Sequence, residues 1–192
     1  MDFNVITGGP CSGKSTLVDL LRDEGFSVSD ESARIIIQEQ KFLPKPILPN
    51  TDFYGFQDLI MQRQEPMEQK LPRGSFLDRS LIDCLAYHVA FSHSPSDVLL
   101  EKVAHAVSQG RYRRIFFLEK VPYHTDGERF EDHKTAQRIH DAIKITYETF
   151  NIPIIGVPDF GCPKQRLDLV KQKIHKKPHY VSLGARVPDE LL

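Results

Sequence analysis

The stretch GGPCSGKST, residues 8–16, decides the fold of this chain. Gly8, four further residues and then Gly13, Lys14 and Ser15 fit the pattern G-x-x-x-x-G-K-[ST] of a phosphate-binding P-loop. Glycine permits backbone angles that a Cβ forbids, so successive N–H groups can turn inward onto phosphate oxygens. The lysine supplies a mobile positive charge for the terminal phosphates, and the serine hydroxyl suits Mg²⁺. The expected nucleotide-binding residues are Gly8, Gly9, Pro10, Cys11, Ser12, Gly13, Lys14, Ser15 and Thr16.

The segments on either side of this loop support a real site rather than a chance glycine turn. Residues 3–7 form a short apolar run typical of a buried strand, and Leu17, Leu20 and Leu21 recur at helical spacing. A strand, a glycine loop and a helix N-terminus form the arrangement in which the helix dipole holds anions. The sequence therefore predicts that this loop binds a nucleotide.

The composition limits the class of protein. A chain of 192 residues is long enough for one hydrophobic core, and its 25 Lys+Arg against 26 Asp+Glu imply no basic face for nucleic acid. No apolar run approaches the length of a membrane span, and the N-terminus lacks a signal-peptide pattern. Three widely spaced cysteines without C-x-x-C indicate free thiols in a reducing, cytoplasmic compartment.

Short apolar runs alternate with helical patterns along the chain. The expected strands are 3–7, 25–30, 74–78, 114–119 and 152–157, and the expected helices are 13–22, 31–40, 53–70, 80–91, 97–109, 132–150 and 163–175. This alternation predicts a parallel sheet with helices on both faces, in an α/β fold. We expect one P-loop domain over residues 1–175 and a C-terminal tail over 176–192.

The residues that end the strands are the next candidates, because ligands of such sheets gather beyond the carboxyl ends of the strands. Asp78 and Arg79 follow the run 74–78, and Asp78 is predicted to hold Mg²⁺ together with Ser15. Glu31 follows the run 25–30, where a carboxylate can take a proton from an attacking hydroxyl. The alternatives are a helix N-cap for Asp78 and an ordinary first-turn acid for Glu31.

Two inserted segments complete the predicted site. The first, about 41–72, carries Phe53, Tyr54, Phe56 and Gln57, which could sandwich a planar base and bond its edge or could equally be core residues of a helix. The second, about 121–132, has turn chemistry and Arg129. It is expected to be a lid that brings an internal arginine to the phosphates, and the alternative is a charged surface loop.

Four longer stretches carry a resemblance to a known family: GGPCSGKSTLVDLL, SDESARIIIQEQ, GSFLDRSLIDCLAYH and RRIFFLEKVPYHTDGERFE. They resemble the small stand-alone AAA-type ATPase family grouped with NadR-like ribosylnicotinamide kinases, over most of residues 3–175. The resemblance implies a three-layer, nucleotide-kinase-like P-loop NTPase fold with five parallel strands in the order 2-3-1-4-5. The D-R-S string is also similar to the strand-end E-R-S of deoxynucleoside kinases and the D-R of thymidylate kinases. That similarity implies that Asp78 serves Mg²⁺ or proton transfer and that Arg79 binds an acceptor or a phosphate.

Strings typical of other P-loop classes do not occur. The sequence has neither the N-K-x-D of guanine-specific switch proteins nor the LSGGQ of transporters. It favours a Mg²⁺-dependent kinase that uses ATP, with GTP as the alternative donor, and phosphorylates a nucleoside, nucleotide or similar small metabolite. Its catalytic residues would be Lys14, Asp78, Arg79, Glu31 and Arg129. The alternative function is a slowly hydrolysing ATP/GTP-binding regulator that acts through a protein or lipid partner, and the sequence gives no indication of oligomeric state.

Overall fold

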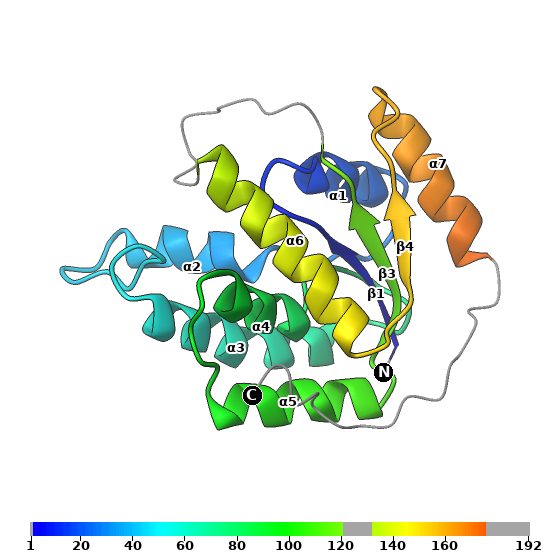
Figure 1. Cartoon of the computed structure of the whole chain (residues 1–192). Coiled ribbons are helices and arrows are strands. Elements are labelled where there is room, and N and C mark those ends of the chain that lie inside the picture. The colour runs from blue at the N-terminus through cyan, green and yellow to red at the C-terminus, as the bar shows by residue number, and fades with distance from the viewer. Residues whose placement is uncertain (1, 121–131, 176–192) are drawn as a thin grey trace.

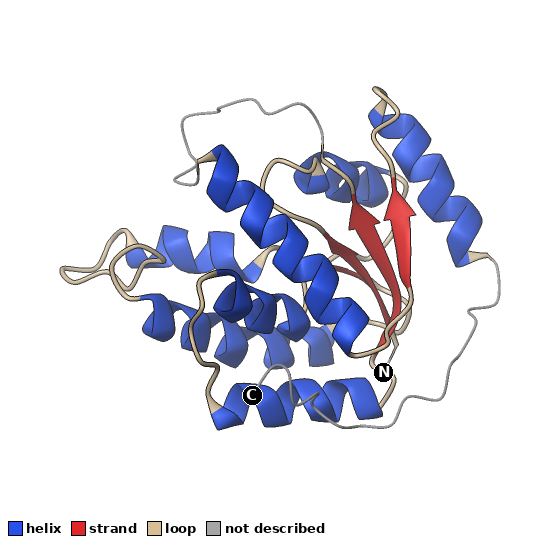
Figure 2. Cartoon of the chain, in the orientation of Figure 1, coloured by secondary structure: helices blue, strands red, loops and turns tan. Residues whose placement is uncertain are grey.

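A parallel β-sheet occupies the centre of the computed structural model, which describes residues 2–120 and 132–175. Within these residues the sheet has four strands in the order β2-β1-β3-β4. The strands are β1 (Phe3–Thr7), β2 (Phe76–Asp78), β3 (Tyr112–Leu118) and β4 (Ile154–Val157). Helices cover both faces of the sheet, which gives three layers (Figures 1 and 2). The predicted α/β fold with a parallel sheet is confirmed.

Seven helices lie in the described part of the chain. They are α1 (Lys14–Asp23), α2 (Ser32–Gln40), α3 (Phe53–Lys70), α4 (Leu81–Ala90), α5 (Asp97–Ser108), α6 (His133–Thr149) and α7 (Pro163–Ile174). Polar side chains cap the N-termini of three of them. Asp52, Ser96 and Asp132 accept hydrogen bonds from backbone N–H groups in the first turns of α3, α5 and α6. Pro163 begins α7 at a position where proline needs no N–H partner.

The strands contribute side chains to two hydrophobic cores, one on each face of the sheet, because successive side chains of a strand point to opposite faces. Val5, Leu77 and Phe117 face the larger core, to which helices α2–α6 contribute. Ile6 and Phe116 face the smaller core, which α1 and α7 cover. Burial on both faces explains why the strands read as nearly continuous apolar runs in the sequence.

The predicted second strand, residues 25–30, is reduced to a single parallel bridge between Val28 and Phe76. The N–H of Phe76 donates to the carbonyl of Ser27 at 2.8 Å, and the N–H of Ser29 donates back to the carbonyl of Phe76 at 2.9 Å. The segment therefore lies beside β2 but does not form a regular ladder with it.

Ser29 ends this pairing with its own side chain. Its hydroxyl accepts the hydrogen bond of the Asp78 N–H at 2.9 Å, where a ladder would use a backbone carbonyl. Its carbonyl accepts from Arg22 of α1 at 3.0 Å instead. The expectation of five strands is therefore wrong by one strand. The order 2-3-1-4-5 of the five segments is confirmed, with the bridge in the place of the second strand.

The insert predicted over 41–72 consists of a loop and α3, which lies beside α2 and α4 (Figure 1). The predicted lid, with Arg129, lies outside the described residues except for Asp132, and so does the tail 176–192. No helix that the structure describes is both long and apolar enough to cross a membrane.

Candidate functional site

The P-loop connects β1 to α1 at the carboxyl edge of the sheet. Gly13 has φ 81°, a left-handed conformation that strains any residue with a Cβ, and it immediately precedes the first residue of α1, Lys14. The N–H groups at the start of α1 have no partner within the helix, so this end of the loop favours an anion.

The side chain of Lys14 lies inside the loop. Its ammonium donates hydrogen bonds to the carbonyls of Gly8 at 3.0 Å and Gly9 at 2.8 Å, and to the hydroxyl of Ser12 at 3.4 Å. Burial, together with the positive charge of Arg79, lowers the pKa of Lys14 to about 8. These three loop oxygens hold the ammonium inside the loop.

Asp78 ends β2 next to the P-loop, as the sequence predicted. Its side chain is buried, and among the described residues its Oδ1 has no hydrogen-bond partner. Burial and the nearby charge of Glu31 raise the pKa of Asp78 to about 7. A buried carboxylate oxygen without a partner is costly unless a cation or a proton occupies it. With the Ser15 hydroxyl lining the same cleft, this donor set fits Mg²⁺, which prefers oxygen ligands.

Arg79 adopts an unusual backbone conformation and points toward two carboxylates. Its φ of 73° lies in the left-handed region, which costs a non-glycine residue roughly 1–2 kcal/mol. Its Nε donates to Glu31 at 3.0 Å and its Nη1 donates to Asp83 at 3.3 Å. The guanidinium also lies 5.4 Å from the centre of the Tyr87 ring. These contacts hold the side chain at the strand end and compensate the backbone strain.

Glu31 immediately precedes α2, and positively charged neighbours keep its carboxyl group ionised. Burial opposes the charged form, but the charges of Arg79 and Lys14 outweigh it and hold the pKa of Glu31 below its ordinary value. Two carboxylates at one cleft, Glu31 and Asp78, thus have pKa values displaced in opposite directions. Such a pair is typical of sites where the two groups take different chemical roles.

Asp83 is a further residue of this site, and the sequence reasoning did not assign it a role. It is almost fully buried on α4 and accepts from Arg79 and from the backbone N–H of Ser80 at 2.8 Å. It also accepts hydrogen bonds from the hydroxyls of Thr7 and Tyr147. The D-R-S-x-x-D string contained the signal, because an acid three residues after a serine N-cap is a capping box.

Gln64 of α3 connects α2 to the strand end. Its Oε1 accepts from Ser32 at 2.9 Å, and its Nε2 donates to Glu68 at 3.0 Å and to the carbonyl of Arg79 at 3.3 Å. The insert helix therefore supports the backbone of Arg79 directly. The sequence analysis did not single out Gln64, because its partners Ser32 and Arg79 lie outside its own helix.

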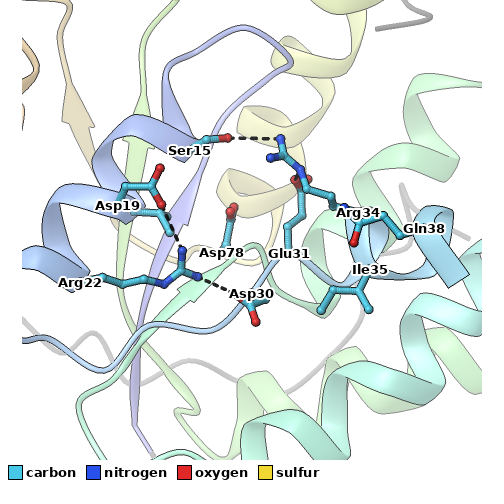
Figure 3. Close-up of a pocket in the computed structure, with 10 residues that line it drawn as sticks. Ser15, Asp19, Arg22, Asp30, Glu31, Arg34, Ile35, Gln38 and Asp78 are labelled. Carbon is cyan, nitrogen blue, oxygen red and sulfur yellow. Dashed lines mark hydrogen bonds and ion pairs between the residues drawn. The ribbon is translucent and has the colours of Figure 1, made fainter. Parts of the chain in front are cut away.

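A cleft of about 270 Å³ opens between α1 and α2, with Asp78 at its base (Figure 3). Arg22 pairs with Asp19 of the same helix, α1, at 3.1 Å and with Asp30 on the side of α2 at 2.6 Å. Arg34 reaches from α2 to the Ser15 hydroxyl at 3.4 Å. Three of the predicted site residues, namely Ser15, Glu31 and Asp78, line this cleft, with Asp78 between the other two in the view of Figure 3. Lys14 and Arg79 do not line the cleft, but their positive charges act to lower the pKa values of Glu31 and Asp78.

The aromatic residues of the insert differ in burial. Phe56 is a core residue, whereas Tyr54 is about half exposed. Phe53 packs its ring against His88, 5.0 Å away between centres. Gln57 is 5 % exposed, yet its Oε1 has no hydrogen-bond partner in the part of the chain that the structure describes.

Two side chains from distant helices hold the P-loop from outside. His140 of α6 accepts the N–H of Gly9 at 3.2 Å through its Nδ1, and burial lowers its pKa, which keeps that nitrogen free to accept. A Cβ at position 9 would lie 2.6 Å from the Cβ of His140, so this approach requires glycine. Arg166 of α7 donates to the carbonyl of Ser12 at 2.6 Å. No local pattern marks either residue, because their partners lie 131 and 154 positions away.

The fold and the P-loop together define a P-loop protein with a nucleotide-kinase-like fold. Asp78 and Arg79, at the end of β2, and the carboxylate of Glu31, after residues 25–30, lie beside the P-loop at one edge of a parallel sheet. Residues 3–166 match a family of AAA domains, and the chain belongs to this family.

Solved structures with the same fold include three kinds of protein. A NadR protein in complex with NR is 18% identical with a TM-score of 0.65, over 94% of this chain and 54% of that one. A deoxyadenosine kinase from M. mycoides is 13% identical with a TM-score of 0.61, over 91% and 98%. A thymidylate kinase from Ehrlichia chaffeensis is 13% identical with a TM-score of 0.57, over 91% and 98%. This chain therefore spans about half the length of the NadR protein. No curated protein sequence matches it.

Proposed function

We propose that this protein is a Mg²⁺-dependent kinase that transfers the γ-phosphate of ATP to a hydroxyl of a nucleoside, nucleotide or similar small metabolite. The observation that carries the proposal is the pair Glu31–Arg79, joined at 3.0 Å beside a P-loop. A site that only holds a nucleotide does not need an ionised carboxylate beside the phosphates. The deoxyadenosine kinase fold and the NadR complex with AMP-PNP support the same class of chemistry.

The donor would bind through the P-loop. Its N–H groups and Lys14 would hold the phosphate chain, and the ammonium would exchange its three loop oxygens for phosphate oxygens. Ser15 and Asp78 would hold Mg²⁺, which, when bound, neutralises charge on the β- and γ-phosphates. ATP is the favoured donor because the NadR protein of similar fold is known in complex with AMP-PNP.

The acceptor would be activated by Glu31. Its carboxylate faces the cleft and stays ionised, so it can accept the proton of the attacking hydroxyl. In the transfer step, the acceptor oxygen forms a bond to the γ-phosphorus while the bond from phosphorus to the bridging oxygen of ADP breaks. The proton passes to Glu31, and Arg79, which holds that carboxylate, carries positive charge next to the transferring group.

The acceptor's planar part would lie along α3. Gln64 contacts the carbonyl of Arg79 at the strand end. Gln57 lies seven residues earlier in the same helix, which is about 10 Å along the helix axis. This separation is comparable with the length of a nucleoside. The unpaired Oε1 of Gln57 would accept a hydrogen bond from an N–H group at the edge of a base.

Replacing Gln57 by leucine is expected to raise the acceptor KM about 5- to 150-fold, the equivalent of about one to three kcal/mol for a buried acceptor group. The melting temperature should stay the same or rise, because the variant no longer buries an oxygen without a partner. The dissociation constant for ATP should not change. Gln62→Leu, on the exposed side of the same helix, is the matched control. An unchanged acceptor KM in Gln57→Leu would assign Gln57 to the core.

The function is tested by phosphate transfer from Mg-ATP, and separately Mg-GTP, over a panel of nucleosides, nucleotides and ribosylnicotinamide. Hydrolysis without an acceptor is measured in parallel. An acceptor that takes the phosphate far faster than water does would establish the kinase and name its substrate. Tight nucleotide binding with slow release that no acceptor accelerates would contradict the kinase and favour the regulatory NTPase.

A further inference from the structure

Arg166 is a buried charged residue beside the P-loop that the proposed reaction does not use. It is 4% exposed and lies in the first turns of α7. Its guanidinium donates to three backbone carbonyls: Ser12 at 2.6 Å, Glu119 at 2.8 Å and Pro158 at 2.9 Å. These carbonyls belong to the segments that follow β1, β3 and β4, so one side chain connects three loops at the carboxyl edge of the sheet.

The bond to Ser12 fixes the direction of one peptide group in the P-loop. In a trans peptide the carbonyl and the following N–H point to opposite sides of the chain, and the described residues contain no cis peptide bond. With the Ser12 carbonyl directed at Arg166, the N–H of Gly13 is directed away from α7. In a P-loop, phosphate lies on the side of the chain to which such N–H groups point.

Within residues 2–120 and 132–175, the carboxylate in ion-pair range of Arg166 is that of Asp159, at 4.0 Å, and the charge of Glu119 also acts on it. The shorter contacts of the guanidinium are to backbone carbonyls. Its positive charge is therefore only partly neutralised and lies behind the P-loop, where it favours an anion on the other side. Lysine could not replace it fully, because an ammonium is a point charge without the planar fork that reaches three acceptors.

We propose that Arg166 is a positioning residue for the nucleotide phosphates: it directs the Gly13 N–H at the phosphate chain and adds positive potential behind the loop. The inference rests on the proposed function for the presence of a phosphate ligand. It goes beyond that function because Arg166 touches neither the donor nor the acceptor, and acts through the backbone of Ser12 and Gly13.

The test measures binding of inorganic triphosphate and of Mg-ATP to the full chain, by calorimetry, for wild type, Arg166→Lys and Arg166→Met. Steady-state kinetics give the KM values of both substrates, and a melting curve reports the folded fraction. Lys164→Met is the matched control, because it removes a positive charge from the exposed side of the same helix turn.

We expect Arg166→Met to bind triphosphate about 10- to 100-fold more weakly, the range of one charge-assisted hydrogen bond. Arg166→Lys should lose less affinity for triphosphate than Arg166→Met does, and Lys164→Met should bind triphosphate as tightly as the wild type. The acceptor KM should be the same in all variants. A folded Arg166→Met that binds triphosphate within twofold of wild type, with a lower melting temperature, would overturn the proposal.

The outcomes separate this inference from the proposed function. If the wild type binds triphosphate but transfers no phosphate to any acceptor, only the proposed kinase function is overturned. The triphosphate affinities of the Arg166 variants would still test the positioning role. Wild type that does not bind triphosphate would overturn both. If neither Arg166 variant folds, Arg166 belongs to the fold and the positioning role is overturned.

Discussion

Replacing Lys14 by alanine is expected to reduce kcat/KM for ATP about 10²- to 10³-fold, the loss measured when one preorganised charge contact is removed from a transition state. The ammonium is the mobile charge of the P-loop, held by loop oxygens at 2.8 to 3.4 Å. Its removal leaves the γ-phosphate without that positive charge during transfer. The measurement is initial-rate transfer to the best acceptor of the panel, and Lys164→Ala, an exposed lysine of α7, is the control.

The pH dependence gives this prediction a second readout. The pKa of Lys14 is lowered to about 8, so the wild type loses the ammonium charge, and with it affinity for ATP, as the pH rises through 8. Lys14→Ala has no such charge to lose, so its weaker ATP binding should be flat between pH 8 and 9.5. Wild-type transfer rates in Lys14→Ala would mean that the P-loop does not hold the transferred phosphate.

Replacing Asp78 by asparagine is expected to cost about 10²- to 10³-fold in kcat, because an amide cannot supply the charge that holds Mg²⁺ near the phosphates. The activity that remains should require more Mg²⁺ than wild type does. Asp23→Asn, at the exposed end of α1, is the control for the loss of one negative charge. Wild-type activity and wild-type Mg²⁺ dependence in Asp78→Asn would remove Asp78 from the metal site.

The same substitution should stabilise the metal-free protein, and more at pH 8 than at pH 5. Burial and the charge of Glu31 raise the pKa of Asp78 from 3.8 to about 7, while Lys14 and Arg79 act in the opposite direction and Asp83 adds to the rise. The folded state therefore binds more protons than the unfolded state between these pH values, and its stability falls as the pH rises through 7. Asparagine has no proton to lose. Melting curves in EDTA check this, and an equal difference at both pH values would contradict it.

The local part of the site was readable from the sequence, because its chemistry depends on neighbours in the chain. Gly13, Lys14 and Ser15 work through loop conformation and the start of one helix, and both are set within a few residues. The strand-end positions of Asp78 and Glu31 follow from apolar runs that end in acids. Parallel topology then brings such ends to one edge of the sheet.

The reduced second strand shows where pattern reasoning fails. Residues 25–30 have the alternation of a strand, but the Ser29 hydroxyl accepts the Asp78 N–H and ends the ladder. Serine readily offers the backbone a side-chain partner in place of a ladder carbonyl. Whether it does so depends on the position of Asp78 in space, which the sequence near Ser29 does not contain.

The sequence by itself determined the P-loop, the α/β class and the acids that follow the apolar runs, because each depends on short-range patterns, whereas the spatial order of the segments came from the family resemblance. Tertiary structure alone decided how these parts are held. Asp83 and Glu31 hold Arg79, His140 accepts from Gly9, and Arg166 connects the three loops. The physical reason is that a hydrogen bond acts over about 3 Å, while the residues that share these bonds are up to 154 positions apart in the chain.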